Sequence, residues 1–97
     1  MRIVSWNCYQ GLANAEKIKY FKSLNADVAI IPEIREANSN ALKPDSLIWD
    51  TNSRKPGSKM GLGILTFNGF IATELPRHSA FELYLPAVIS KGKISFN

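Results

Sequence analysis

The chain has 97 residues, 45% of them hydrophobic, and a formal net charge of +4. This composition excludes an intrinsically disordered chain and fits one small globular domain. The charge is compatible with a phosphate-bearing partner but is below that of a typical polybasic DNA-binding domain. The single cysteine excludes an internal disulfide, and no apolar run reaches the roughly 18 residues of a membrane span. We therefore expect a cytoplasmic protein with no membrane partner.

A strand and a helix are predicted at the start of the chain. Residues 2–6 are β-branched and aromatic, which favours a strand. Asn14 is a favourable helix N-cap, and Asn25 can adopt the left-handed conformation that ends a helix. Between them, apolar residues recur every three positions and form one stripe along the helix, at Ile18, Phe21 and Leu24.

The apolar run at residues 27–31 predicts a second strand, buried on both faces. Pro32 is expected to end this strand because it has no amide hydrogen to donate. Glu33 then follows, and a charge beside an apolar strand is costly unless it is paired. Mg²⁺ would pair well with its oxygens, whereas a carboxylate that is exposed, or paired with Arg35 or a lysine, is the purely structural alternative. If the two strands are parallel neighbours, Asn7 and Glu33 lie at one edge of the sheet.

The middle of the chain predicts short elements and one basic loop. Residues 36–43 predict a short helix or a loop, and residues 47–49 a brief strand. Residues 51–59 form a loop by composition. Its cations include Arg54 and Lys59, which either contact a phosphate or are simply solvated.

A hairpin is predicted at residues 62–75, because Asn68-Gly69 is a preferred two-residue turn between two apolar runs. The expected cross-strand pairs are Phe67 with Phe70, Leu65 with Ala72, Ile64 with Thr73, and Leu62 with Leu75. Both faces of the hairpin are partly apolar, so we expect both to be covered.

Two further strands are predicted near the end of the chain. The first spans residues 81–89 and is interrupted at Pro86, and the second spans residues 93–97. A strand at the extreme terminus leaves an open edge, which is typical of an interrupted fold.

Three other features carry no predicted chemistry. The glycine-rich run at 57–63 lacks the Gly-Lys-Ser/Thr ending of a P-loop and precedes a strand instead of following one. His78 is the only histidine and has no nearby aspartate, so a surface position is favoured over a catalytic base. Cys8 has no histidine placed to activate it, and a buried structural thiol is favoured.

Two segments, Ser5-Trp6-Asn7-Cys8 and residues 29–33, together resemble the endonuclease/exonuclease/phosphatase superfamily, which includes the DNase I-like enzymes. In that family an N-terminal strand ends in a Trp-Asn type motif, and a second strand ends in a metal-binding glutamate. Residues 61–65 and 85–88 resemble the next strands of the family. The residue before the glutamate is commonly Gln in the family and is Pro32 here, and Tyr9 replaces a frequent second asparagine.

The resemblance implies an α+β fold, with a mixed sheet, a helix between its first two strands, and the N-terminal half of a four-layer sandwich. It implies that Glu33 and Asn7 bind Mg²⁺ or Mn²⁺ in a phosphodiesterase that cleaves a nucleic acid or another phosphodiester with metal-activated water. The histidine-bearing strand, the Gly-Asp-x-Asn motif and the Asp-His pair of the family have no counterpart in the sequence. We therefore expect residues 1–97 to form one incomplete domain that is inactive alone.

A second hypothesis needs no catalysis. The chain would then be a binding or assembly module that pairs with itself, or with a separate second half, through an exposed sheet edge.

Overall fold

The structure is a computed structural model that describes residues 1–7, 12–51, 60–76, 85–91 and 94–96. Within these ranges, strands β1, β2, β4 and β3 form one mixed sheet in that order, and β5, β6 and β7 form a second sheet. The elements are β1 (Ile3–Ser5), α1 (Ala15–Ser23), β2 (Val28–Arg35), α2 (Glu36–Ala41), β3 (Ser46–Thr51), β4 (Met60–Thr66), β5 (Ile71–Glu74), β6 (Ala87–Lys91) and β7 (Ile94–Phe96).

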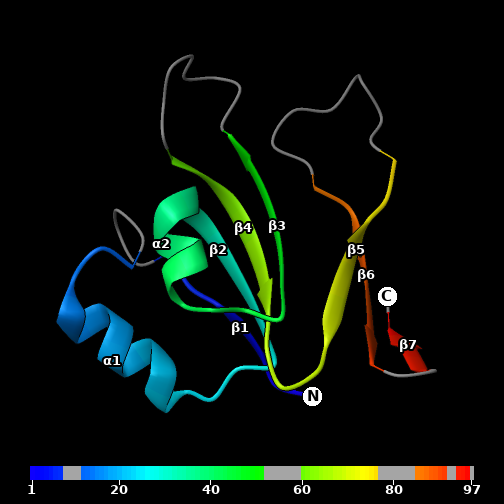
Figure 1. Ribbon diagram of the computed structural model, residues 1–97, viewed down its shortest axis with the longest axis horizontal. Helices are drawn as coiled ribbons and strands as arrows, with labels where there is room; N and C mark the ends of the chain where they lie inside the picture. The colour runs from blue at the N-terminus through cyan, green and yellow to red at the C-terminus, as the bar shows by residue number, and fades with distance from the viewer. Residues whose placement is uncertain (8–11, 52–59, 77–84, 92–93, 97) are drawn as a thin grey trace.

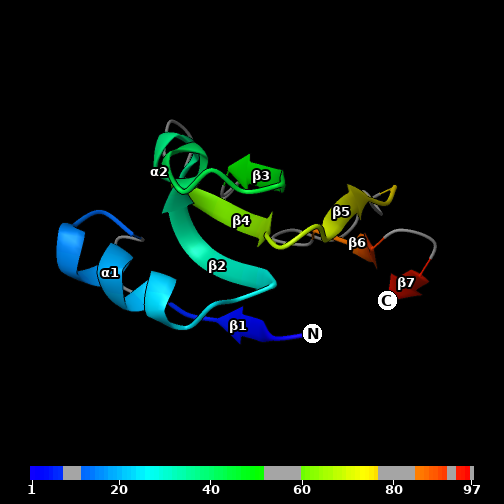
Figure 2. The ribbon, with the colours of Figure 1, turned by 60° about the horizontal axis from the view of Figure 1, so that its bottom comes forward.

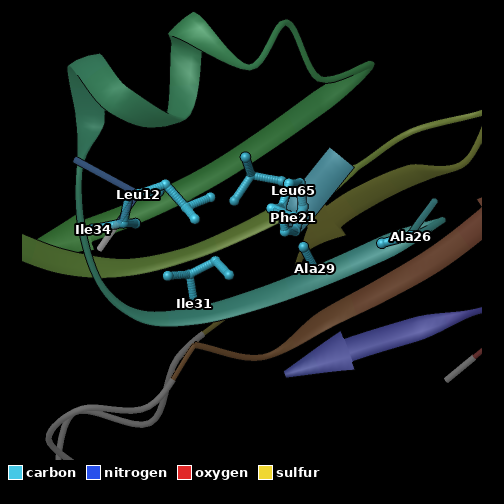
Figure 3. Close-up of a cluster of buried hydrophobic side chains, with 7 residues drawn as sticks. All are labelled: Leu12, Phe21, Ala26, Ala29, Ile31, Ile34 and Leu65. Atoms are coloured by element: carbon cyan, nitrogen blue, oxygen red, sulfur yellow. The ribbon is translucent and has the colours of Figure 1, made fainter. Parts of the chain in front are cut away.

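The first sheet lies between the helices on one face and the second sheet on the other (Figures 1 and 2). On the helix side, apolar side chains from α1, β2 and β4 form a buried cluster, shown in Figure 3: Leu12, Phe21, Ala26, Ala29, Ile31, Ile34 and Leu65. On the other face a smaller cluster joins the two sheets: Val28, Ile48, Ile64 and Ala72. The architecture is therefore mixed α/β. In the described part of the chain no helix is long and apolar enough to cross a membrane.

The predicted β1–α1–β2 unit is confirmed. β1 and β2 run parallel, with Ser5 opposite Ile30, and α1 connects them. The Asn14 side chain caps the helix by accepting a hydrogen bond of 2.9 Å from the amide of Lys17. Asn25 ends the helix with a φ of 47°. Local sequence signals therefore fix both ends of α1.

The predicted hairpin at 62–75 is wrong in its pairing beyond the turn, where only the Phe67–Phe70 pair is present, through a 3.2 Å backbone hydrogen bond. The turn itself is present, because Asn68 and Gly69 have φ angles of 58° and 85°. However, β4 pairs with β2 and β3, whereas β5 pairs with β6 in the second sheet. Both edges of β4 are thus occupied, and β5 has no edge of β4 to join. The expectation that both faces of the hairpin are covered is confirmed for β4, since Leu65 and Ile64 belong to the two opposite clusters, but it is wrong for β5, where only Ala72 is buried.

Other predicted elements are confirmed with shifted limits. The 36–43 segment is a helix, the 47–49 strand extends to Ser46–Thr51, and a last strand is present at Ile94–Phe96. Within the described residues, the strand predicted at 81–89 is β6, Ala87–Lys91, and residues 81–84 lie outside the described ranges. Among the residues of the first sheet, β1 pairs with β2 alone, so it forms an edge of that sheet.

Asp27 ties the start of the first sheet to the turn after β4. Its carboxylate accepts hydrogen bonds from the Asn68 side chain at 2.8 Å and from the Arg2 amide at 2.7 Å. These two bonds, with the Asn68 bond the larger effect, hold the pKa of Asp27 below its ordinary value. The ionised carboxylate is thus part of the folded structure.

We expect Asp27→Asn to reduce the acid sensitivity of the fold. In the unfolded chain Asp27 binds a proton at its ordinary pKa of 3.8, whereas the folded chain binds it only at lower pH. Its contribution to the free energy of unfolding is therefore complete above that pH and is lost as the pH falls through the lowered pKa. Urea unfolding at pH 6 and pH 3 should show a smaller loss of midpoint in Asp27→Asn than in the wild type. An equal loss would contradict this role.

Candidate functional site

Pro32 does not end β2, which corrects the prediction from sequence. The strand pairs with β4 at Ile31 opposite Gly63, and pairing resumes at Ile34 opposite Gly61. Three steps along β2 therefore match two steps along β4, so two residues, Pro32 and Glu33, lie opposite the single residue between those glycines. This arrangement is a β-bulge. A bulge tolerates a proline because the extra residues are not part of the hydrogen-bonded ladder.

The bulge places Glu33 on the face of the sheet that is opposite to the helices. Ile31 and Ile34 both belong to the helix-side cluster, so the two residues between them are turned away from it. Pro32 and Glu33 are both exposed. The Glu33 side chain is thus exposed to solvent, whereas Ile31 and Ile34, on the two sides of the bulge, are 0% exposed.

Asn7 lies at the same end of the neighbouring strand. The parallel register places Ser5 opposite Ile30, and the Trp6 amide donates a 3.2 Å hydrogen bond to the carbonyl of Ile30. When this register is continued by two residues, Asn7 lies opposite Pro32, the residue before Glu33. Trp6 packs against the helix-side cluster, so alternation directs Asn7, which is exposed, to the other face. The strand order and the parallel register therefore place Asn7 and Glu33 at the same end of two neighbouring strands.

The donor set suits a hard divalent cation. A carboxylate and an amide offer two oxygens, and Mg²⁺ is commonly held by one or two carboxylates while it keeps several waters. No group of three or more His, Cys, Asp or Glu side chains suited to a metal ion occurs within the described ranges. A carboxylate that binds the ion is not free to take up a proton, and an amide is not a base, so these two residues can bind and orient a ligand.

The remaining candidates lie outside the described residues. Arg54 and Lys59, the predicted phosphate contacts, belong to residues 52–59, and Cys8 and His78 likewise lie in the segments omitted from the description. Their roles stay predictions.

Sequence reasoning missed the surroundings that shape the bulge. Trp49, predicted only as part of a short strand, donates a hydrogen bond from its indole nitrogen to the carbonyl of Ile34 at 2.8 Å. The sequence did contain one signal for the bulge. Two apolar residues, Ile31 and Ile34, lie on either side of a proline, which is typical of a strand that is interrupted and then continues with the same face buried.

Comparisons with known proteins do not assign the chain to a family. No protein-family model matches it, and searches of curated proteins and of solved structures found no match. The functional reading therefore depends on the residues and their placement.

Proposed function

We propose that this chain is the N-terminal part of a metal-dependent phosphodiesterase domain similar to the endonuclease/exonuclease/phosphatase superfamily. The observation that carries the proposal is that Asn7 lies two residues after β1 and Glu33 lies in β2, and that these two strands are parallel neighbours. The resemblance assigns the same two residue types to the same two strands. A second sheet packed on the face opposite the helices agrees with the layered sandwich that the resemblance implies.

Each residue has a distinct role in this proposal. Glu33 supplies the charged oxygen that holds Mg²⁺ or Mn²⁺, and the Asn7 amide orients the ion or a phosphate oxygen. When bound, such an ion stabilises the negative charge that develops on the phosphoryl group. Two residues without a general base do not complete a hydrolytic site, so we expect the chain to bind a phosphodiester without cleaving it.

Binding of a phosphodiester tests the proposal directly. A thymidine dinucleotide, titrated with and without Mn²⁺, should bind measurably only when Mn²⁺ is present, and its phosphodiester should stay intact. Binding that is equal with and without the metal would contradict the proposal, because it would place the ligand on the basic surface instead of at Glu33. The control ligand is thymidine, which has no phosphate.

Self-association is a second proposal, favoured by the edge strand β1. Met1 and Ile3 are 55% and 56% exposed, beside a backbone edge that pairs only with β2 among the described strands. Unpaired edges of this kind associate with other strands. Sedimentation should show a dimer at high concentration, and a monomer at every concentration would exclude this function.

A further inference from the structure

The tryptophan on β3 reaches across a whole strand to β2. β4 lies between β3 and β2 in the sheet, yet the indole N–H of Trp49 donates its 2.8 Å hydrogen bond to the carbonyl of Ile34. That carbonyl belongs to the residue immediately after Glu33. The bond therefore fixes the backbone at the point where the bulge returns to the regular ladder.

Two glycines on β4 make this bond feasible. A Cβ atom on Gly61 would lie 2.8 Å from Cε2 of the Trp49 ring, and a Cβ atom on Gly63 would lie 2.9 Å from Cγ2 of Ile34. Real Cβ atoms do not approach other atoms so closely, so each glycine is needed for its neighbour to occupy its position. Gly61 thus leaves room for the indole where it crosses β4, and Gly63 leaves room for the Ile34 side chain whose carbonyl accepts the bond.

Helix α2 holds the next residue of β2. The hydroxyl of Ser39, which is 0% exposed, donates a 3.2 Å hydrogen bond to the carbonyl of Arg35. The carbonyls of the two residues after Glu33 are thus each held by one side chain from another element. Ile34 itself is 0% exposed in the helix-side cluster. The C-terminal side of the bulge is thereby anchored while the Glu33 side chain stays exposed.

We propose that Trp49 is a positioning residue for Glu33. It acts through the backbone of Ile34, in the space that Gly61 leaves for its ring, and it holds the bulge in the form that presents the carboxylate at the end of the sheet shared with Asn7. Outer residues that orient a ligand contribute about 10–100-fold to metal affinity. The predicted effect on metal binding rests on the proposed function, whereas the effect on the bulge does not.

Trp49→Phe tests this role, because phenylalanine keeps an aromatic ring and lacks the N–H donor. We expect amide hydrogen exchange in the bulge, at Glu33 and Ile34, to become faster and Mn²⁺ affinity to fall about tenfold. The matched control is Leu47→Val, which trims a neighbour on the same strand and the same face and should leave both quantities unchanged. Ser39→Ala, a second variant, should speed exchange at Arg35 while Glu33 and Ile34 stay protected.

The two readouts separate the two proposals. Faster amide exchange at Glu33 and Ile34 in Trp49→Phe, but not in Leu47→Val, supports the positioning role of Trp49 at any measured Mn²⁺ affinity. Exchange that is unchanged in Trp49→Phe, or equally fast in the control, would overturn the positioning role. A wild-type chain that binds no Mn²⁺ would instead reject the proposed function.

Discussion

Gly61→Ala should destabilise the protein by about 3 kcal/mol or more, because a methyl group at this position has no space. Its Cβ atom would lie 2.1 Å from the backbone carbonyl oxygen of Asp50 and 2.8 Å from the Trp49 ring. A backbone oxygen within a sheet can move only if β3 moves. The substitution therefore separates β3 from β4, and a domain of this size has a total stability of only about 5–15 kcal/mol.

Gly63→Ala is the matched control for this loss. Its Cβ atom would meet side chains only, at 2.9 Å from Ile34 and 3.3 Å from Leu65, and a side chain can shift with less cost than the backbone carbonyl that Gly61→Ala would meet. We expect a loss of about 1 kcal/mol. Both substitutions replace glycine by alanine, so they restrict the unfolded chain equally. The difference between the two losses in free energy of unfolding therefore measures the clash with the backbone in the folded state. Urea unfolding measures both, and a loss in Gly61→Ala no larger than in Gly63→Ala would contradict the close approach.

Glu33→Gln should lower Mn²⁺ affinity about tenfold or more, since glutamine keeps the shape of the side chain and removes the charge that a divalent cation requires. Glu33 is exposed, so the fold should be unaffected. Calorimetric titration with Mn²⁺ measures the affinity of each variant.

Glu36→Gln is the control for Glu33→Gln. Glu36 is an exposed glutamate in the first turn of α2, three residues further along, so its substitution makes the same change in net charge. We expect it to leave Mn²⁺ affinity close to that of the wild type. Equal losses in the two variants would show that the ion is attracted by general negative charge, not held by Glu33.

The parts of the fold that were predictable from sequence are those that depend on neighbouring residues. Helix α1 begins at a capping asparagine and ends at Asn25, and both signals act within one turn. The apolar run of β2 and the parallel β1–β2 pair follow from the order of strand, helix and strand. Asn7 lies two residues after β1 and Glu33 lies within β2, so the sequence indicates at which end of these strands the two residues lie.

The errors arose where distant residues decide the outcome. The Asn68-Gly69 turn is the same in a hairpin and in this structure, but the edges of β4 are already taken by β2 and β3. At the turn, the Gly69 amide donates to the Asp45 carboxylate and the Ala72 amide to the Ser46 hydroxyl. Asp45, just before β3, and Ser46, its first residue, thus accept hydrogen bonds from the segment that a hairpin would pair with β4.

The bulge at Pro32 has a similar explanation. Proline ends a regular ladder, which is what local reasoning predicts. Pairing nevertheless resumes at Ile34, where the Trp49 indole and the buried Ile34 side chain stabilise the return to the sheet. Those contacts come from β3 and from the helix-side cluster, so the residues next to Pro32 contain no signal for them.

The central claim is that Asn7 and Glu33 hold one divalent cation at the same edge of the first sheet. Paramagnetic broadening of amide NMR signals by substoichiometric Mn²⁺ tests it most directly. We predict that the signals of Asn7 and Glu33 broaden first and together, while those of Asp27 and Asp45, which precede β2 and β3 at the opposite end of the sheet, stay sharp. Earlier broadening at Asp27 or Asp45, or broadening of Glu33 without Asn7, would contradict the claim.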